Sequence, residues 1–129
     1  MTNKRVAALL EEIADLIEIE GTDARKAGAY RRAARTVSAL RDDLRTYLQG
    51  DRLLTLPGIG PVIAGKIRDF YATGSTRLLD ELRAKVPAGV QRLLAVPGLG
   101  PKTAGRLYHE LGVDSPQALR EALEDGRVA

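Results

Sequence analysis

Two short glycine-rich segments carry the residues of this chain that are best suited to bind a ligand. Gly58-Ile59-Gly60-Pro61 recurs 40 residues later as Gly98-Leu99-Gly100-Pro101. Glycine lacks a β-carbon and permits positive φ, so the backbone amides around it can face outward together. Proline at the first position of a helix loses no hydrogen bond, so each segment predicts a turn that leads into a helix. The free amides at such a helix start carry the positive end of the helix dipole and suit a phosphate group.

Basic side chains follow both turns. Lys66 and Arg106 occupy equivalent positions one turn into the two helices, and Lys102 lies closer to the second turn. The apolar residue between each pair of glycines is expected to point inward and to lock the hairpin. The residues expected to contact phosphates are Gly58, Ile59, Gly60, Lys66, Gly98, Leu99, Gly100, Lys102, Thr103 and Arg106.

The repeat extends well beyond the turns. Residues 53–67 and 93–107 are identical at 8 of 15 positions, and each copy predicts a short apolar helix, a Pro-Gly turn and a second helix. One glycine-rich turn is typical of an ordinary connection between helices. Two copies with a basic residue after each indicate the helix-hairpin-helix motif, which grips the nucleic-acid backbone without reading bases. The alternative is a duplicated turn that only packs.

The remaining pattern is helical throughout. Apolar residues over 6–17 recur with a period of 3.6, and a second stripe over 27–37 includes Tyr30. No alternation typical of strands is present. The sequence therefore predicts an all-α protein of two small helical lobes, residues 1–83 and 84–129, each with one helix-hairpin-helix motif. The predicted N-caps are Thr2, Asp23, Asp42, Ser75 and Ser115.

Composition excludes several classes of function. The chain has 129 residues, a net charge of +3, no cysteine and 4% aromatic residues. Disulfides and thiolate sites are therefore excluded, and a wide base-stacking platform is disfavoured. The charge is divided unevenly: residues 1–20 and 113–129 carry −3 and −2, whereas residues 21–45 and 84–112 carry +4 and +3. A basic interior between acidic ends suits an anionic partner.

The whole of residues 3–126 resembles the N-terminal region of family X DNA polymerases, the DNA polymerase beta-like repair enzymes, and the bacterial and archaeal members most closely. The matching segments are 11–18 (EEIADLIE), 28–35 (GAYRRAAR), 56–60 (LPGIG), 72–74 (ATG) and 96–104 (VPGLGPKTA). The resemblance implies an "8 kDa-like" domain that holds the 5′-phosphate side of a DNA gap. It also implies the start of a subdomain that grips duplex DNA on the primer side.

The resemblance further implies a 5′-phosphate pocket formed by Arg25, Lys26, Tyr30 and Arg31. Judged on helical spacing alone, Tyr30 could equally be a core residue. The arginine run Arg31, Arg32 and Arg35 could also be a solvated face, but the neighbouring Lys26 and the local charge of +4 favour DNA.

Some members of the family are 5′-deoxyribose-phosphate lyases, and by motif Lys66 would be the amine that forms their Schiff base. Two positions depart from the lyase-active pattern, because Val62 and Leu78 stand where those relatives carry lysines. The alternative role for Lys66 is a phosphate contact. Enzyme activity is therefore uncertain.

Polymerase catalysis needs carboxylates that hold two Mg²⁺ ions, and the chain has no Asp-x-Asp pair. Mg²⁺ is expected only if a polymerase domain belongs to the parent protein. The chain is thus expected to be a fragment or a stand-alone DNA-binding relative, and Gly126-Arg127-Val128 looks like the family's lead-in to a further loop.

DNA binding itself is expected to need no cofactor. The resemblance nevertheless implies a Na⁺ or K⁺ ion in each hairpin, held by backbone carbonyls. Its ligands would be Leu54, Leu56 and Ile59 in the first hairpin and Leu94, Val96 and Leu99 in the second.

The partner expected is gapped or nicked duplex DNA with a 5′-phosphate, bound by a monomer during DNA repair, including base excision repair. The expected location is the cytoplasm, at the nucleoid, with no membrane association. A helical protein-interaction domain is the alternative from another class. The acidic residues of the first predicted helix are expected to form a solvated face. The single histidine, His109, is not expected to bind a metal.

Overall fold

The computed structural model describes residues 1–21 and 23–126, and every regular element in these residues is helical. The elements are α1 (Asn3–Glu20), α2 (Ala24–Ala39), the 3₁₀ turns η1 (Leu44–Tyr47) and η2 (Arg52–Thr55), α3 (Pro61–Thr73), α4 (Arg77–Lys85), α5 (Ala88–Leu93), α6 (Pro101–Leu111) and α7 (Pro116–Glu124). No strand occurs in the described ranges. The prediction of an all-α protein is confirmed.

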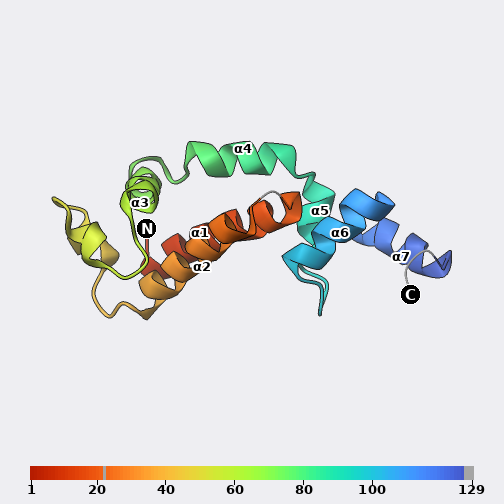
Figure 1. The fold of residues 1–129 in the computed structure, drawn as a ribbon, viewed down its shortest axis with the longest axis horizontal. Helices are drawn as coiled ribbons and strands as arrows, with labels where there is room; N and C mark the ends of the chain where they lie inside the picture. The colour runs from red at the N-terminus through yellow and green to blue at the C-terminus, as the bar shows by residue number, and fades with distance from the viewer. Residues whose placement is uncertain (22, 127–129) are drawn as a thin grey trace.

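The long helices α1 and α2 pair side by side along the middle of the molecule (Figure 1). The first hairpin, made by η2 and α3, lies at one end, and α5, α6 and α7 lie at the other. Helix α4 runs between these ends and packs on α1. The apolar stripe of α1, which includes Leu9, Leu10 and Ile13, is buried in the hydrophobic core.

Most helix boundaries follow the predicted caps. The side chains of Thr2, Asp23 and Ser115 each accept a backbone N–H from the first turn of their helix. Two predicted caps are wrong by one residue. Asp43, not Asp42, caps η1, which is a 3₁₀ turn and not an α-helix.

The second shifted cap lies before α4. Thr76 accepts the N–H of Leu79 at 3.2 Å, whereas the hydroxyl of Ser75 donates to Asp80 Oδ1 at 2.7 Å. Helix α4 therefore begins at Arg77. Ser75 lies before the helix and hydrogen-bonds to the side chain of its residue Asp80.

The two halves of the chain share one core. The predicted division between residues 83 and 84 falls inside α4, which ends at Lys85, and the division into lobes stays a prediction. Buried apolar residues form one cluster that extends from α1 to α7. Residues 127–129 lie outside the described residues. They belong to the predicted second lobe and include the last two residues of the segment Gly126-Arg127-Val128. Within those residues, no helix combines the length and apolar character needed to cross a bilayer.

Candidate nucleic-acid interface

The two hairpins repeat in backbone geometry as well as in sequence. Gly58 and Gly98 adopt left-handed φ values of 77° and 81°, which an L side chain rarely adopts. The residue after each closes the turn: the Ile59 N–H donates to Leu56 at 3.2 Å, and the Leu99 N–H donates to Val96 at 3.1 Å. Ile59 is buried and Leu99 is half-buried against the core. The prediction that these apolar residues point inward is therefore confirmed for Ile59 and met in part by Leu99.

The N-termini of α3 and α6 lack the side-chain caps that α1, α2, α4 and α7 possess. Their N-caps are Gly60 and Gly100, each followed by proline, and no side chain in the described part of the chain accepts their first-turn amides. Both glycines have ordinary extended backbones, with φ of −92° and −89°. Apart from the glycines themselves and their neighbours along the chain, no atom of the described residues lies within 4 Å of the place where a β-carbon would stand. Neither backbone conformation nor packing requires glycine here, so its effect is to leave the amides of the helix start open.

The cations that follow the hairpins are free to meet a ligand. Lys102, Thr103 and Arg106 are exposed on α6, and Lys66 is half-buried on α3. None of the four side chains makes a hydrogen bond or ion pair within the described part of the chain. Lys102 also lines a cavity of about 310 Å³ with Gly21 and the α2 residue Ala24. The second hairpin thus lies beside the start of α2.

Arg25 and Lys26 stand exposed on the first turn of α2, next to this cavity. Their side chains have no protein partner among the described residues. Of the four residues predicted for the 5′-phosphate pocket, these two are positioned to meet a ligand. They lie beside the second hairpin.

Tyr30, the third predicted pocket residue, does not reach the surface. It is only 2% exposed, and its hydroxyl has no hydrogen-bond partner among residues 1–21 and 23–126. Burial raises the pKa of Tyr30 to about 12. The interpretation of Tyr30 as a core residue fits the structure, and the pocket role does not.

Arg31, the fourth, is occupied by carboxylates of α1. Its guanidinium lies 2.7 Å from Glu11 and 3.0 Å from Asp15, and its Nε donates to Glu18 at 2.9 Å. Burial lowers the pKa of Arg31, but the hydrogen bonds that it donates to Glu18 and Asp15 outweigh this and raise the pKa. Burial also raises the pKa of Asp15, against the opposing effect of Arg31. Arg31 joins α2 to α1 and is not free for a phosphate.

The acidic residues of α1 are therefore more than a solvated face. Besides the three around Arg31, Glu12 forms a two-point ion pair with Arg83 of α4, with Nε–Oε2 and Nη2–Oε1 distances of 2.6 and 2.7 Å. The hydrogen bond to Glu12 raises the pKa of Arg83. These carboxylates hold α2 and α4 on α1, and their negative charge is offset in part by the two arginines.

The predicted ion sites consist of hard carbonyl oxygens, which suit Na⁺ or K⁺. The Leu56 and Val96 carbonyls already accept one amide each within the hairpins, which leaves each oxygen one further lone pair. Among the described residues, no turn, cap or side-chain hydrogen bond reaches the other four predicted carbonyls, those of Leu54, Ile59, Leu94 and Leu99. The donor chemistry fits, and the ion stays a prediction. No cluster of His, Cys, Asp and Glu suited to a metal occurs in the described ranges.

Two residues of α2 that were not predicted to contact the first hairpin lie against it. The aliphatic part of Arg32 lies over Gly58, and Thr36 Oγ1 donates to the Pro57 carbonyl at 2.7 Å. The sequence placed Arg32 in a basic run with Arg31 and Arg35. The sequence does not show that these arginines have different roles, because each role depends on the residues that the side chain contacts in the folded protein.

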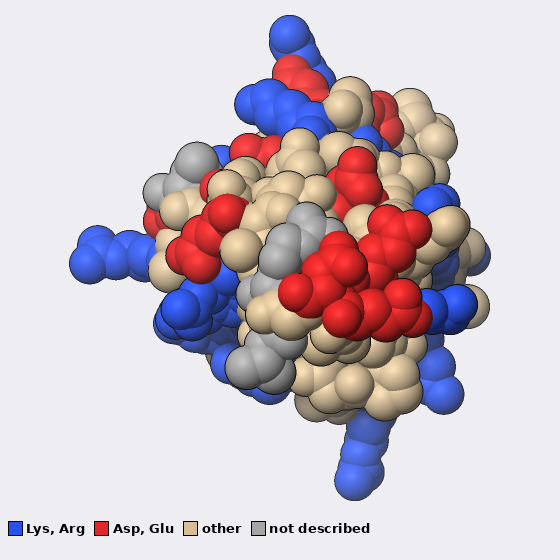
Figure 2. Space-filling view, turned by 90° about the vertical axis from the view of Figure 1, so that its right-hand side faces the viewer, with Lys and Arg blue, Asp and Glu red and all other residues tan. Residues whose placement is uncertain are grey.

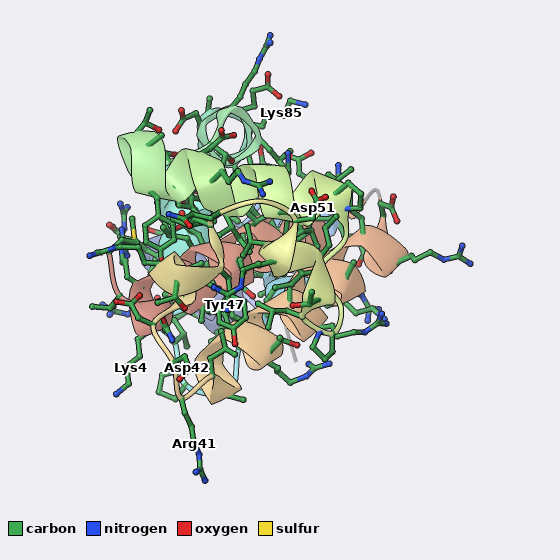
Figure 3. All side chains as sticks on the ribbon, turned by 90° about the vertical axis from the view of Figure 1, so that its left-hand side faces the viewer. Lys4, Arg41, Asp42, Tyr47, Asp51 and Lys85 are labelled. Atoms are coloured by element: carbon green, nitrogen blue, oxygen red, sulfur yellow. The ribbon has the colours of Figure 1, made fainter. Side chains whose placement is uncertain are left out.

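Charge is segregated over the surface. The end formed by α7 shows acidic side chains gathered at its middle, with Lys and Arg toward the edges (Figure 2). The opposite end shows Lys4 and Arg41 extending outward from the ribbon, with Tyr47, the last residue of η1, near the centre of the view (Figure 3). There Arg52 lies over the ring of Tyr47, 4.9 Å from its centre. The acidic α7 end is the less suitable face for an anionic partner.

Comparison with known proteins agrees with this geometry. Residues 1–76 match the "Helix-hairpin-helix domain" family, and residues 50–112 and 90–127 match the "SAM-like Helix-hairpin-helix tandem" family. The chain belongs to the helix-hairpin-helix domain family.

The chain is also 38% identical over 128 residues to "DNA polymerase/3'-5' exonuclease PolX" of Bacillus subtilis (strain 168). That alignment covers 99% of this chain and 22% of the relative's length. The resemblance to the N-terminal region of family X polymerases is confirmed. The family matches and this similarity together support DNA binding in a polymerase-related context.

Proposed function

We propose that this chain binds DNA by its phosphates, without regard to base sequence, and prefers gapped duplexes that carry a 5′-phosphate. The observation that carries the proposal is the pair of open helix starts behind Gly60 and Gly100. Every other α-helix longer than six residues has its first turn capped by a side chain, whereas α3 and α6 offer bare amides to solvent. Amides and the helix dipole bind phosphate oxygens, which are the same at every base pair.

The cations on the same surface add affinity and salt dependence. Lys102 and Arg106 follow the second open helix start, and Lys66 lies one turn into the first. Each phosphate neutralised by such a cation releases counterions, so log K falls by about 0.9 per contact for each unit of log salt concentration. These three cations therefore predict a slope of about −2.7.

The preference for a gap rests on Arg25 and Lys26. Two unpaired cations on the first turn of α2, beside the second hairpin, suit a terminal phosphate, which carries more charge than a phosphodiester. The resemblance to family X polymerases supports the same assignment, and with it a role in repair.

The test is a fluorescence-anisotropy titration of gapped duplexes that differ only in a 5′-phosphate or 5′-hydroxyl. We expect tighter binding of the phosphate form and loss of that preference in Lys26→Ala. Lys85→Ala is the matched control, because Lys85 extends from the far side of α4 (Figure 3). Equal affinity for both duplexes would contradict the gap preference. A log–log salt slope near zero would contradict phosphate binding itself and favour a protein-interaction domain.

A second candidate activity is the lyase, favoured by one observation: Lys66 is half-buried and its amine has no partner in the described residues. The amine would attack C1′ of the ring-opened sugar and release water as the Schiff base forms. Loss of a C2′ proton would then expel the 3′-phosphate oxygen. Borohydride reduction should trap a covalent adduct with the wild-type protein and none with Lys66→Ala; an equal yield from both would exclude Lys66.

A further inference from the structure

The two hairpins differ at one position where a cation is expected. The residue after the helix-starting proline is Lys102 in the second hairpin and Val62 in the first. Val62 is 67% exposed, so it is not there to fill the core. The first hairpin has the same open amides as the second but lacks a basic side chain in the first turn of α3.

The first hairpin has instead a neighbour that the second lacks. The Cγ and Cδ atoms of Arg32 lie 3.0 Å from where a β-carbon of Gly58 would stand. Thr36, one turn further along α2, holds the Pro57 carbonyl at 2.7 Å. At the equivalent Gly98, no described atom lies within 4 Å of the corresponding place. Helix α2 thus supports one hairpin and leaves the other open.

The charged end of Arg32 is unoccupied. Arg32 is exposed, and its guanidinium forms no ion pair or hydrogen bond within the described residues. Its neighbour Arg31 is held by three carboxylates. The stem of Arg32 is therefore fixed against the turn while its charge remains available, which lowers the entropy lost when it binds an anion.

We propose that Arg32 of α2 binds a phosphate at the first hairpin. It would have the role there that Lys102, a residue of the hairpin itself, has in the second. The phosphate would be held by the open amides of α3 and by the Arg32 guanidinium. The inference rests on the proposed function, since it assigns a further contact in the same DNA interface. It also explains why Val62 can stand where the second copy has lysine.

The test uses Arg32→Met, which keeps an unbranched stem over Gly58 and removes the charge. We expect DNA affinity to fall about tenfold and the salt slope to become shallower by about 1. Arg35→Met is the matched control: it removes the same charge from α2, but Arg35 borders a different cavity with Lys4 and Glu11. Its affinity should change less than threefold, with thermal unfolding of both variants near that of the wild type.

A rescue variant separates a specific contact from general charge. Adding Val62→Lys should restore about tenfold of affinity in the Arg32→Met background and add less than threefold to the wild type. Equal gains in both backgrounds, or equal losses in Arg32→Met and Arg35→Met, would overturn the assignment of Arg32 while DNA binding stands. Wild-type protein that binds no DNA would instead overturn the proposed function.

Discussion

Gly105 of α6 lies so close to Ile19 at the end of α1 that a β-carbon at position 105 would stand 2.7 Å from the Ile19 carbonyl oxygen. The same carbonyl lies 2.8 Å from Nε2 of His109, one turn along α6. The single histidine therefore has a structural partner. These contacts dock α6 on α1 and so fix the second hairpin beside the start of α2.

This close approach predicts that Gly105→Ala is destabilising. The added methyl group must displace backbone, so we expect the free energy of unfolding to fall by about 1–3 kcal/mol, measured by urea denaturation. Gly65, the equivalent residue of α3, has open space around it and provides the control. Gly65→Ala should stabilise by about 0.5–1 kcal/mol, because alanine is the better helix former. Equal effects of the two substitutions would show that α6 is not docked through Gly105.

Arg31 is predicted to act on stability and not on DNA. Its side chain is 24% exposed among three carboxylates, so Arg31→Met leaves them partly buried and unpaired. After allowance for solvent screening, we expect a loss of about 1–2 kcal/mol in unfolding free energy. The slope of log affinity against log salt should stay that of the wild type under conditions where the variant is folded. A slope shallower by about 1 would place Arg31 on a phosphate after all.

Tyr30 is predicted to have no effect on DNA affinity but to affect the stability of the protein at alkaline pH. Its folded pKa of about 12 lies above the unfolded value of 10.0, so its contribution is fully present below pH 10 and is lost as pH rises toward 12. Tyr30→Phe removes a buried hydroxyl without a partner and should raise stability at pH 7 by about 1 kcal/mol. It should also flatten the loss above pH 10 in thermal unfolding. Weaker binding of a 5′-phosphate duplex by Tyr30→Phe would contradict the buried position.

Thr36 is predicted to support the first hairpin through its hydrogen bond to Pro57. Thr36→Val keeps the shape and removes the donor, so stability should fall by about 0.5–1.5 kcal/mol. DNA affinity should fall with it, because the turn loses its attachment to α2. Thr46→Val removes a similar hydroxyl-to-carbonyl bond in η1 and should leave affinity unchanged. Equal affinities of the two variants would show that the hairpin does not need this support.

The sequence predicted those features that depend on neighbours along the chain. The caps at Thr2, Asp23 and Ser115 and the duplicated hairpin all follow from local residue types. Features that depend on contacts across the fold were not accessible in this way.

Arg31 and Arg32 show the limit most clearly. They are adjacent and chemically identical, yet a turn of about 100° along the helix directs one to the carboxylates of α1 and the other to Gly58. The same limit applies to Tyr30, whose spacing fitted both a core and a surface position. The resemblance to a family supplied the pocket assignment, whereas the structure buries Tyr30 in the core and pairs Arg31 with the carboxylates of α1.

The central claim is that the bare helix starts behind Gly60 and Gly100 bind DNA, and the double variant Gly60→Ser, Gly100→Ser tests it most directly. Serine is uncharged, fits the extended backbone at both positions and caps the open amides. Thermal unfolding should occur at the same or a higher temperature, since serine improves on glycine as an N-cap by a few tenths of a kcal/mol, about 0.3 per site. Affinity for duplex DNA should fall at least tenfold at the same salt concentration. A folded double variant that binds DNA as tightly as the wild type would contradict the account.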